Sequence, residues 1–146
     1  MKRFLFLFIF VLQAAIIFSI NYYVNAVGGS DDNPGTEPCL AWKSLAQVNR
    51  NRFTPGDTIF LAMGSHWHEY LQPGGSGSWE APIVITPYGE GRKPLLIGTG
   101  EPGRGILSLF NQSHWEISSL EIVNNGRDHA DRRGVEIRAE NAGVIH

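Results

Sequence analysis

Short apolar runs separated by turn-forming residues make up most of this chain after its first twenty residues. Residues 58–61, 82–88 and 95–97 are rich in aliphatic and aromatic side chains, and Pro or Gly clusters separate them. Within 82–88, Ile83 and Ile85 alternate with other residues and therefore share one face of a strand. Strands at this spacing predict an all-β fold, arranged either as a sandwich or as a solenoid.

One segment has a helical pattern instead. Leu40, Leu45 and Val48 recur at roughly helical spacing, while Lys43 and Arg50 lie elsewhere on the surface of such a helix. The first layer of a solenoid needs a cover, because it would otherwise expose unpaired backbone groups and apolar side chains. We expect this short amphipathic helix to cap the N-terminal end of the stack.

The end of the chain repeats an earlier stretch. Shifting residues 106–117 by 30 positions aligns small or apolar residues at every second place. The repetition favours a parallel β-solenoid, in which stacked Asn side chains can hydrogen-bond between layers. Because the last unit needs a neighbour or a cap, we expect the solenoid to continue, with this chain as the N-terminal part of a longer protein. The aligned pairs are Leu107 with Ile137, Leu109 with Ala139, Asn111 with Asn141, Ser113 with Gly143, and Trp115 with Ile145.

The N-terminus has the pattern of a secretory signal peptide. Lys2 and Arg3 precede an unbroken apolar run at residues 4–12, and further apolar residues follow to position 20. We place the signal at residues 1–19 and the β domain at 20–146, with cleavage after Ala26 as the alternative. A membrane anchor is the competing reading of the same run. The prediction is therefore a secreted, cell-surface or periplasmic protein without a stable membrane span after cleavage.

Charge and cysteine content argue against a nucleic-acid partner and against an internal disulfide. The chain has 12 Lys+Arg and 14 Asp+Glu residues, and no basic stripe points to a nucleic-acid partner. Cys39 is the single cysteine, so no disulfide can form within this chain.

The richest cluster of candidate functional groups lies at residues 127–133. Arg132 and Arg133 could bind carboxylates bidentately, and His129 could act as a base near neutral pH. The alternative is a solvated loop with local Asp–Arg pairs. Trp79 lies in a Gly- and Ser-rich loop and is the best candidate for an exposed aromatic that stacks on a sugar ring.

Metal sites have weaker support. His66 and His68 would point the same way on a strand, but zinc usually takes three or four ligands. Residues 31–33 are acidic or amide-bearing, but they lack the continuation of the helical calcium-binding loop. We predict no metal site in this chain.

Pro55-Gly-Asp57 and Tyr88-Gly-x-Gly91 belong to a series of short motifs along the chain. Together these motifs resemble the N-terminal region of right-handed parallel β-helix repeat proteins, the pectate-lyase-like secreted group. The resemblance covers roughly residues 22–146. It implies a right-handed parallel β-helix, export, and a polysaccharide or other glycan as partner. Some members are uronan lyases, for which calcium is a cofactor by resemblance alone. The motifs fall at residues 22–24, 29–36, 42–45, 55–59, 64–71, 76–77, 82–85, 88–91 and 93–94.

The resemblance transfers no catalytic residue, because the catalytic groups of the lyase members lie on coils further along than this chain extends. The leading hypothesis is the N-terminal portion of an exported enzyme that acts on polysaccharide, either a uronan lyase or a glycosidase. The alternatives are a non-catalytic glycan-binding or surface-scaffold β-helix and an incomplete gene product. Fold analogy alone leaves catalysis open.

Overall fold

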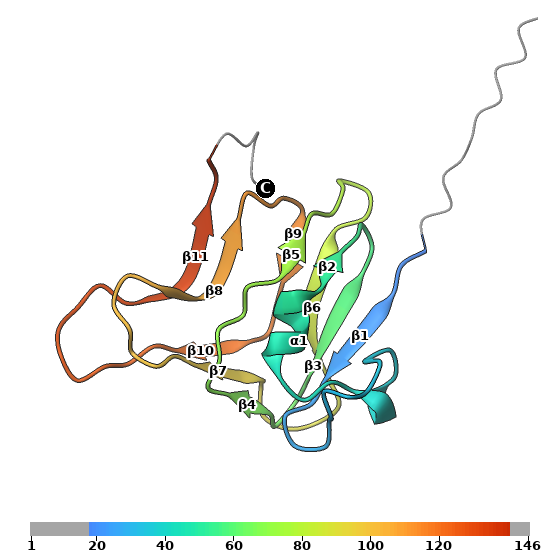
Figure 1. Cartoon of the computed structure of the whole chain (residues 1–146), viewed down its shortest axis with the longest axis horizontal. Helices are drawn as coiled ribbons and strands as arrows, with labels where there is room; N and C mark the ends of the chain where they lie inside the picture. The colour runs from blue at the N-terminus through green and yellow to red at the C-terminus, as the bar shows by residue number, and fades with distance from the viewer. Residues whose placement is uncertain (1–17, 141–146) are drawn as a thin grey trace, which may run out of the picture.

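The computed structural model describes residues 18–140, and strands dominate this part of the chain. The expected all-β class is confirmed, since within residues 18–140 short β-strands accompany one α-helix and one 3₁₀ helix (Figure 1). In chain order the elements are β1 (Asn21–Val24), η1 (Pro38–Leu40), α1 (Leu45–Arg50), β2 (Arg52–Phe53), β3 (Thr58–Ala62), β4 (His66–Trp67), β5 (Gly74–Gly75), β6 (Ile83–Tyr88), β7 (Leu95–Ile97), β8 (Gly105–Phe110), β9 (Trp115–Ile117), β10 (Glu121–Val123) and β11 (Arg133–Arg138).

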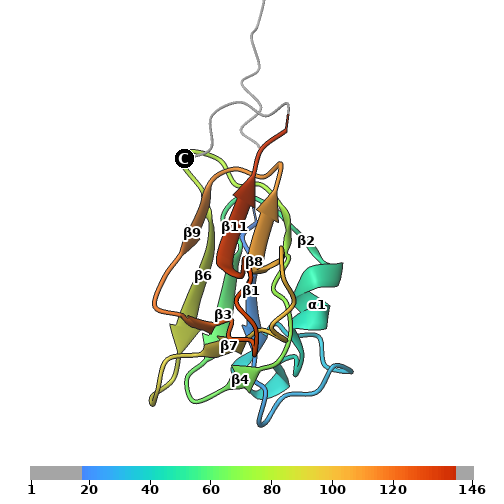
Figure 2. The ribbon, with the colours of Figure 1, turned by 90° about the vertical axis from the view of Figure 1, so that its left-hand side faces the viewer.

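The strands of the described region pair in parallel and form several small sheets. The orders are β1-β3-β6-β9, β10-β7-β4, β11-β8 and β2-β5. Neighbouring strands in a sheet are not consecutive in the sequence. After each strand the chain contributes strands to other sheets before it returns and adds the next strand to the first sheet. We call each such circuit a pass of the chain. Figures 1 and 2 show β8 and β11 side by side, across the molecule from the β1-β3-β6-β9 sheet. Parallel strands require such crossovers because a tight hairpin cannot join them.

The register between the repeated units differs from the expected one. Val135 pairs with Leu107 and Ile137 pairs with Leu109, an offset of 28 rather than 30 residues. A two-residue slip keeps the same side chains on the inner face, so the alternation was right while the pairing was wrong. The expected pairing of Asn111 with Asn141 lies outside the described residues. Instead, the Asn111 Oδ1 accepts a hydrogen bond from the Glu140 N–H at 2.6 Å.

Columns of inward-facing side chains fill the core. Tyr22, Ile59, Ile85 and Ile117 occupy one register position on the successive strands β1, β3, β6 and β9. Ile59 and Ile85 are fully buried in the middle of this column. Burying each of these side chains stabilises the fold by roughly 1.5–3 kcal/mol. The column couples strands that are far apart in the sequence.

The expected short helix is present, although it begins later than the pattern suggested. Leu45 and Val48 are buried on α1, whereas Leu40 belongs to η1 and is 39% exposed. The Asn49 side chain donates to the Tyr70 carbonyl at 2.8 Å and accepts from the Gln72 N–H at 2.6 Å. The helix therefore covers the segment that follows β4, at the end of the stack where β1 and β2 also lie.

Asp31 stabilises the start of this helix. Its Oδ1 accepts hydrogen bonds from the backbone N–H groups of Lys43 and Ser44, both at 2.9 Å. Partial burial raises the pKa of Asp31, but hydrogen bonds from the Ser44 backbone and side chain and from the Lys43 backbone outweigh it. The pKa of Asp31 is therefore lowered overall.

Within residues 18–140, no helix is long and apolar enough to cross a membrane. Most of the expected signal peptide, residues 1–19, lies outside the described part of the chain.

Asp57 links the first two strands of the main sheet, and its removal should destabilise the fold. Asp57 is 2% exposed, and its carboxylate accepts from the Ile20 and Thr54 N–H groups, each at 2.8 Å. Asp57→Ala leaves these donors without a partner, so we expect a loss of about 2–3 kcal/mol in the free energy of unfolding. Urea unfolding measures the change. Asp32→Ala, at an exposed position, is the control, and equal small effects of both variants would contradict the assignment.

Asp31 should make stability depend on pH in the acid range. Because its folded-state pKa lies below the unfolded value, its contribution is present above about pH 4 and is lost as pH falls through the folded pKa. We expect Asp31→Asn to reduce stability modestly at pH 7, and this difference from the parent chain should shrink towards pH 2–3. Urea unfolding at several pH values tests this. A difference that stays constant with pH would show that the carboxylate charge does not matter.

Candidate functional site

A surface hollow surrounds Trp79, the aromatic residue predicted to be exposed. Trp79 is 74% exposed, and the hollow has a volume of about 280 Å³. It lies where the loop between β5 and β6 meets the beginning of β9. The residues that line it are Ser78, Trp79, Pro82, His114, Trp115 and Glu116.

Backbone hydrogen bonds fix the two segments that form this hollow. The Gly77 N–H donates to the Ser113 carbonyl at 3.0 Å, and the Ile83 N–H donates to the His114 carbonyl at 2.9 Å. A Cβ atom at Gly77 would lie 2.5 Å from the His114 carbonyl oxygen, so glycine permits this close approach. The hollow is therefore built on a rigid junction between two passes of the chain.

His114 has an unusual backbone conformation. Its φ is 57°, in the left-handed region that non-glycine residues rarely adopt. Its Nδ1 lies 3.0 Å from the Ser113 Oγ. Residues held in this region often cluster at functional sites, where the surrounding structure supports the strain.

The next two residues point to opposite sides of β9. Trp115 is partly buried, shares a register position with the buried Ile83, and donates from Nε1 to the Gly75 carbonyl at 3.0 Å. Glu116 is exposed and pairs with Val84. The alternation along β9 thus fixes an indole toward the core and presents a carboxylate on the outer face.

This combination suits the binding of a sugar. An exposed indole can stack on the carbon–hydrogen face of a pyranose, and carboxylate, imidazole and hydroxyl groups can hydrogen-bond its hydroxyls. Glu116 is the single carboxylate that lines the hollow. Because glycoside hydrolysis usually needs a pair of carboxylates across the scissile bond, the residues here favour binding over bond cleavage.

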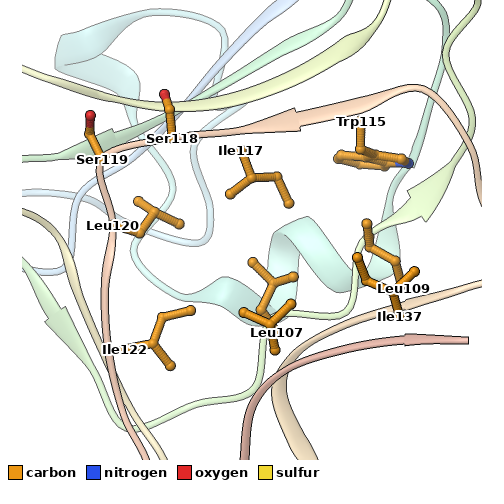
Figure 3. Close-up of a pocket in the computed structure, with 10 residues that line it drawn as sticks. Leu107, Leu109, Trp115, Ile117, Ser118, Ser119, Leu120, Ile122 and Ile137 are labelled. Carbon is orange, nitrogen blue, oxygen red and sulfur yellow. The ribbon is translucent and has the colours of Figure 1, made fainter. Parts of the chain in front are cut away.

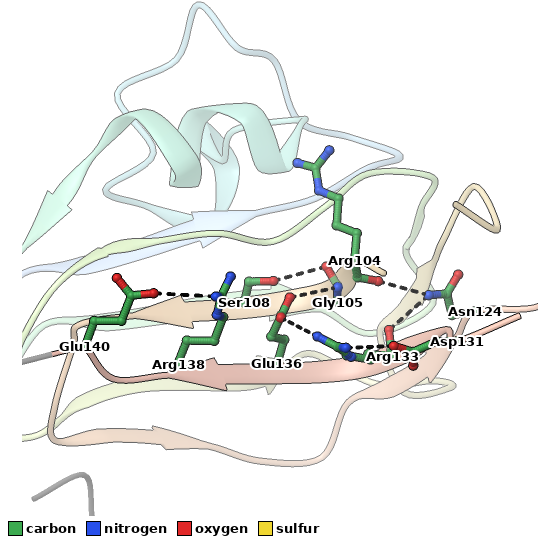
Figure 4. Close-up of polar contacts among 9 residues, drawn as sticks. All are labelled: Arg104, Gly105, Ser108, Asn124, Asp131, Arg133, Glu136, Arg138 and Glu140. Atoms are coloured by element: carbon green, nitrogen blue, oxygen red, sulfur yellow. Dashed lines mark hydrogen bonds and ion pairs between the residues drawn. The ribbon is translucent and has the colours of Figure 1, made fainter. Parts of the chain in front are cut away.

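The predicted cluster at residues 127–133 has a different environment. Arg133 pairs with Asp131 and Glu136, each at 2.7 Å, at the beginning of β11 (Figure 4). Hydrogen bonding and charge from Asp131, and then from Glu136, raise the pKa of Arg133.

Arg132 and His129 lie in the loop that precedes Arg133. The Arg132 Nε donates to the Gly100 carbonyl at 2.8 Å, and its Nη1 donates to the Asp128 carbonyl. His129 is exposed in the same loop. None of the three candidates lines the hollow of Trp79, so the structure does not combine the four predicted residues in one site.

Sequence reasoning missed His114 and Glu116. The signal was present, because residues 113–116 follow an asparagine turn and alternate on a short strand. Their approach to Trp79 depends on the register of β9 with β6, which the chain pattern alone did not provide.

The residues weighed as metal ligands have other roles or contacts. The rings of His66 and His68 lie 6.3 Å apart in an edge-to-face arrangement, and Asp31 accepts the two backbone N–H groups before α1. Among residues 18–140, no group of three or more His, Cys, Asp or Glu side chains could hold a metal ion.

An apolar groove of about 390 Å³ lies at the other end of the stack from α1. Its side chains come from β8, β9, β10, β11 and the turn after β9, and they converge on a shared space (Figure 3). Val135 and Ile137 are 52% and 53% exposed there, although their register partners Leu107 and Leu109 are buried. The groove therefore has the composition of a core surface.

Comparison with known proteins points to glycosidases. No family model matches the chain. A lacto-N-biosidase of Bifidobacterium longum subsp. longum is 32% identical over 133 residues, covering 73% of this chain and 8% of that protein. An alpha-1,3-galactosidase A of Akkermansia muciniphila is 41% identical over 101 residues, covering 69% of this chain and 17% of that protein.

Solved structures agree with these relatives. Crystal structures of the GH136 lacto-N-biosidase from Eubacterium ramulus, as selenomethionine derivative and native protein, match with TM-scores of 0.72 and 0.71. Both matches have 29% sequence identity and cover 84% of this chain and 26% of that protein chain. This chain thus spans about a quarter of the solved relatives and less than a fifth of the curated ones.

These findings correct the family expected from the sequence. The resemblance to the pectate-lyase-like group was wrong, because the matching structures are GH136 lacto-N-biosidases. The motifs that suggested it are turn and strand signals, which report backbone geometry. The relatives named above are glycosidases, and none of them is a lyase.

Proposed function

We propose that this chain forms the N-terminal, glycan-contacting part of an exported glycoside hydrolase that acts on galactose-containing glycans. The observation that carries the proposal is the hollow in which Trp79, His114 and Glu116 meet on a rigid junction. The similarity to a lacto-N-biosidase and to an alpha-1,3-galactosidase supports this class of substrate. In this proposal the hollow holds one sugar unit, and cleavage takes place elsewhere in the enzyme.

A non-catalytic glycan-binding protein is the second candidate. Its support is the same hollow, because Glu116 is the single carboxylate lining it. The two candidates share the binding step and differ in what surrounds it. Catalysis of a lacto-N-bioside or an alpha-1,3-galactoside by an enzyme containing this chain would distinguish them.

We also propose that the parallel sheets continue as a right-handed parallel β-helix. Inward-facing columns already stack from β1 through β9 and from β8 to β11. The apolar groove is the inner surface of the last described pass, and one further pass of parallel strands would bury it. The solved relatives are longer than this chain, which covers 26% of them.

Trp79 should be required for sugar binding. We expect Trp79→Ala to abolish measurable binding of galactose-terminated disaccharides to the 146-residue chain, because the stacking surface is lost. Isothermal titration calorimetry measures the affinity, and circular dichroism checks that the fold is intact. Phe110→Ala, which removes another exposed aromatic ring, is the matched control. Unchanged affinity in Trp79→Ala would refute the proposed site.

The apolar side chains exposed in the groove between β8 and β11 predict a surface through which copies of the chain associate. We expect Val135→Lys combined with Ile137→Lys to reduce concentration-dependent association and binding of a hydrophobic dye, because both side chains expose apolar area on a strand edge. Sedimentation velocity and dye fluorescence measure these effects. Phe110→Lys, of similar exposure but on the outer face of β8, is the control. Equal effects of the two charge changes would contradict an inner surface.

A further inference from the structure

A second, more polar hollow lies on the outer face of the β4-β7-β10 sheet. It has a volume of about 370 Å³, and its lining residues come from three segments of the chain, at positions 64–66, 92–95 and 121. His66 and Glu121 both pair with Leu95, so these three side chains share the outer face. Their sequence neighbours Trp67 and Leu96 are buried on the opposite face. The residues that line the hollow are Gly64, Ser65, His66, Arg92, Lys93, Leu95 and Glu121.

Backbone hydrogen bonds hold these segments together. The Gly64 N–H donates to the Arg92 carbonyl at 2.7 Å, and the Leu95 N–H donates to the Ser65 carbonyl at 3.0 Å. The Glu121 N–H donates to the Pro94 carbonyl at 2.9 Å. Ser65 is 2% exposed. The positions from which the charged side chains project are therefore fixed before any ligand arrives, which reduces the entropy cost of binding.

The balance of charge in this hollow favours an anion. Arg92 and Lys93 are the two basic residues of the lining and His66 adds an imidazole, whereas Glu121 is the single acidic residue in the lining. The ion pairs of the described part of the chain all involve Arg133 or Arg138, so no described carboxylate lies within 4.0 Å of Arg92 or Lys93. The chain as a whole has a formal net charge of −2, so the cations here are concentrated against the overall sign.

We propose that this hollow binds the oxyanion of an acidic glycan, either a carboxylate or a sulfate ester. The Arg92 guanidinium can bind such a group bidentately, and Lys93 adds a second positive charge. Leu95 offers an apolar contact for the carbon skeleton of the sugar, and Glu121 can accept hydrogen bonds from sugar hydroxyls. The glycan part of this inference rests on the proposed function, whereas the anion preference rests on the charges alone.

The test compares neutral and acidic sugars on the 146-residue chain at low ionic strength. Calorimetric titrations use lactose, a sulfated lactose, a sialylated lactose and inorganic sulfate. We expect the acidic sugars to bind about tenfold or more tightly than lactose, because charge-assisted hydrogen bonds add to the neutral contacts. The advantage should fall as salt is raised. The sulfated and sialylated arms show which oxyanion is preferred.

Charge variants locate the effect. Arg92→Ala combined with Lys93→Ala should remove the preference for acidic sugars. Lys43→Ala combined with Arg52→Ala removes the same charge from exposed positions outside the hollow and should leave the preference intact. Equal affinity for neutral and acidic sugars, or equal losses in the two double variants, would overturn the proposal. Binding of inorganic sulfate without binding of acidic sugars would overturn its glycan part.

Trp79→Ala separates this inference from the proposed function. If the variant loses lactose binding and keeps Arg92-dependent binding of acidic sugars, the two sites are independent and both proposals stand. If Trp79→Ala leaves lactose binding unchanged while Arg92→Ala/Lys93→Ala removes the acidic preference, the anion site stands and the Trp79 site fails.

Discussion

The fold depends on the burial of side chains that occupy equivalent register positions on successive parallel strands. Ile59 and Ile85 are fully buried because Tyr22 lies on one side of them and Ile117 on the other. Each strand is too short to be stable alone, and its apolar face is buried only when the preceding and following passes are in place. The strands of the stack therefore stabilise one another. At each end of the described stack, the outermost strands have a neighbour on one side only.

The two ends of the described stack differ in whether their apolar surface is covered. At one end, α1 covers the segment after β4 through the Asn49 amide, and the Asp31 carboxylate holds the start of this helix. At the other end, Val135 and Ile137 present an apolar surface although their partners Leu107 and Leu109 are buried. Parallel sheets with polar hollows at their corners are consistent with the similarity to much longer glycosidases.

Both candidate binding sites follow from this division of the molecule. The buried strand positions described above carry mostly apolar side chains, so candidate binding groups lie mainly on outer faces and in the turns between strands. The Trp79 hollow and the Arg92 hollow each form where turns from different passes are joined by backbone hydrogen bonds. The first offers an aromatic surface with one carboxylate, and the second offers an excess of positive charge. Their different chemistry suggests contacts with different parts of a glycan.

The sequence by itself determined the class of secondary structure, the short helix and the exposed position of Trp79. These features follow from local alternation, helical spacing and turn residues, which act over a few neighbouring positions. The match of Asn111 with Asn141 suggested an offset of 30, whereas the strands pair at 28. Turn and strand motifs also suggested the wrong family, because they encode backbone geometry that unrelated active sites can share.

Only the tertiary structure decided which distant residues meet. His114 and Glu116 approach Trp79 because β9 pairs with β6, and Arg92 approaches His66 because β7 pairs with β4. The pairing of Arg133 with Asp131 and Glu136 is by contrast a local contact, and the sequence had offered local Asp–Arg pairs as the alternative for this loop. The physical reason is that loop lengths between parallel strands vary, so side-chain periodicity fixes the face of each residue while packing between passes fixes its partner.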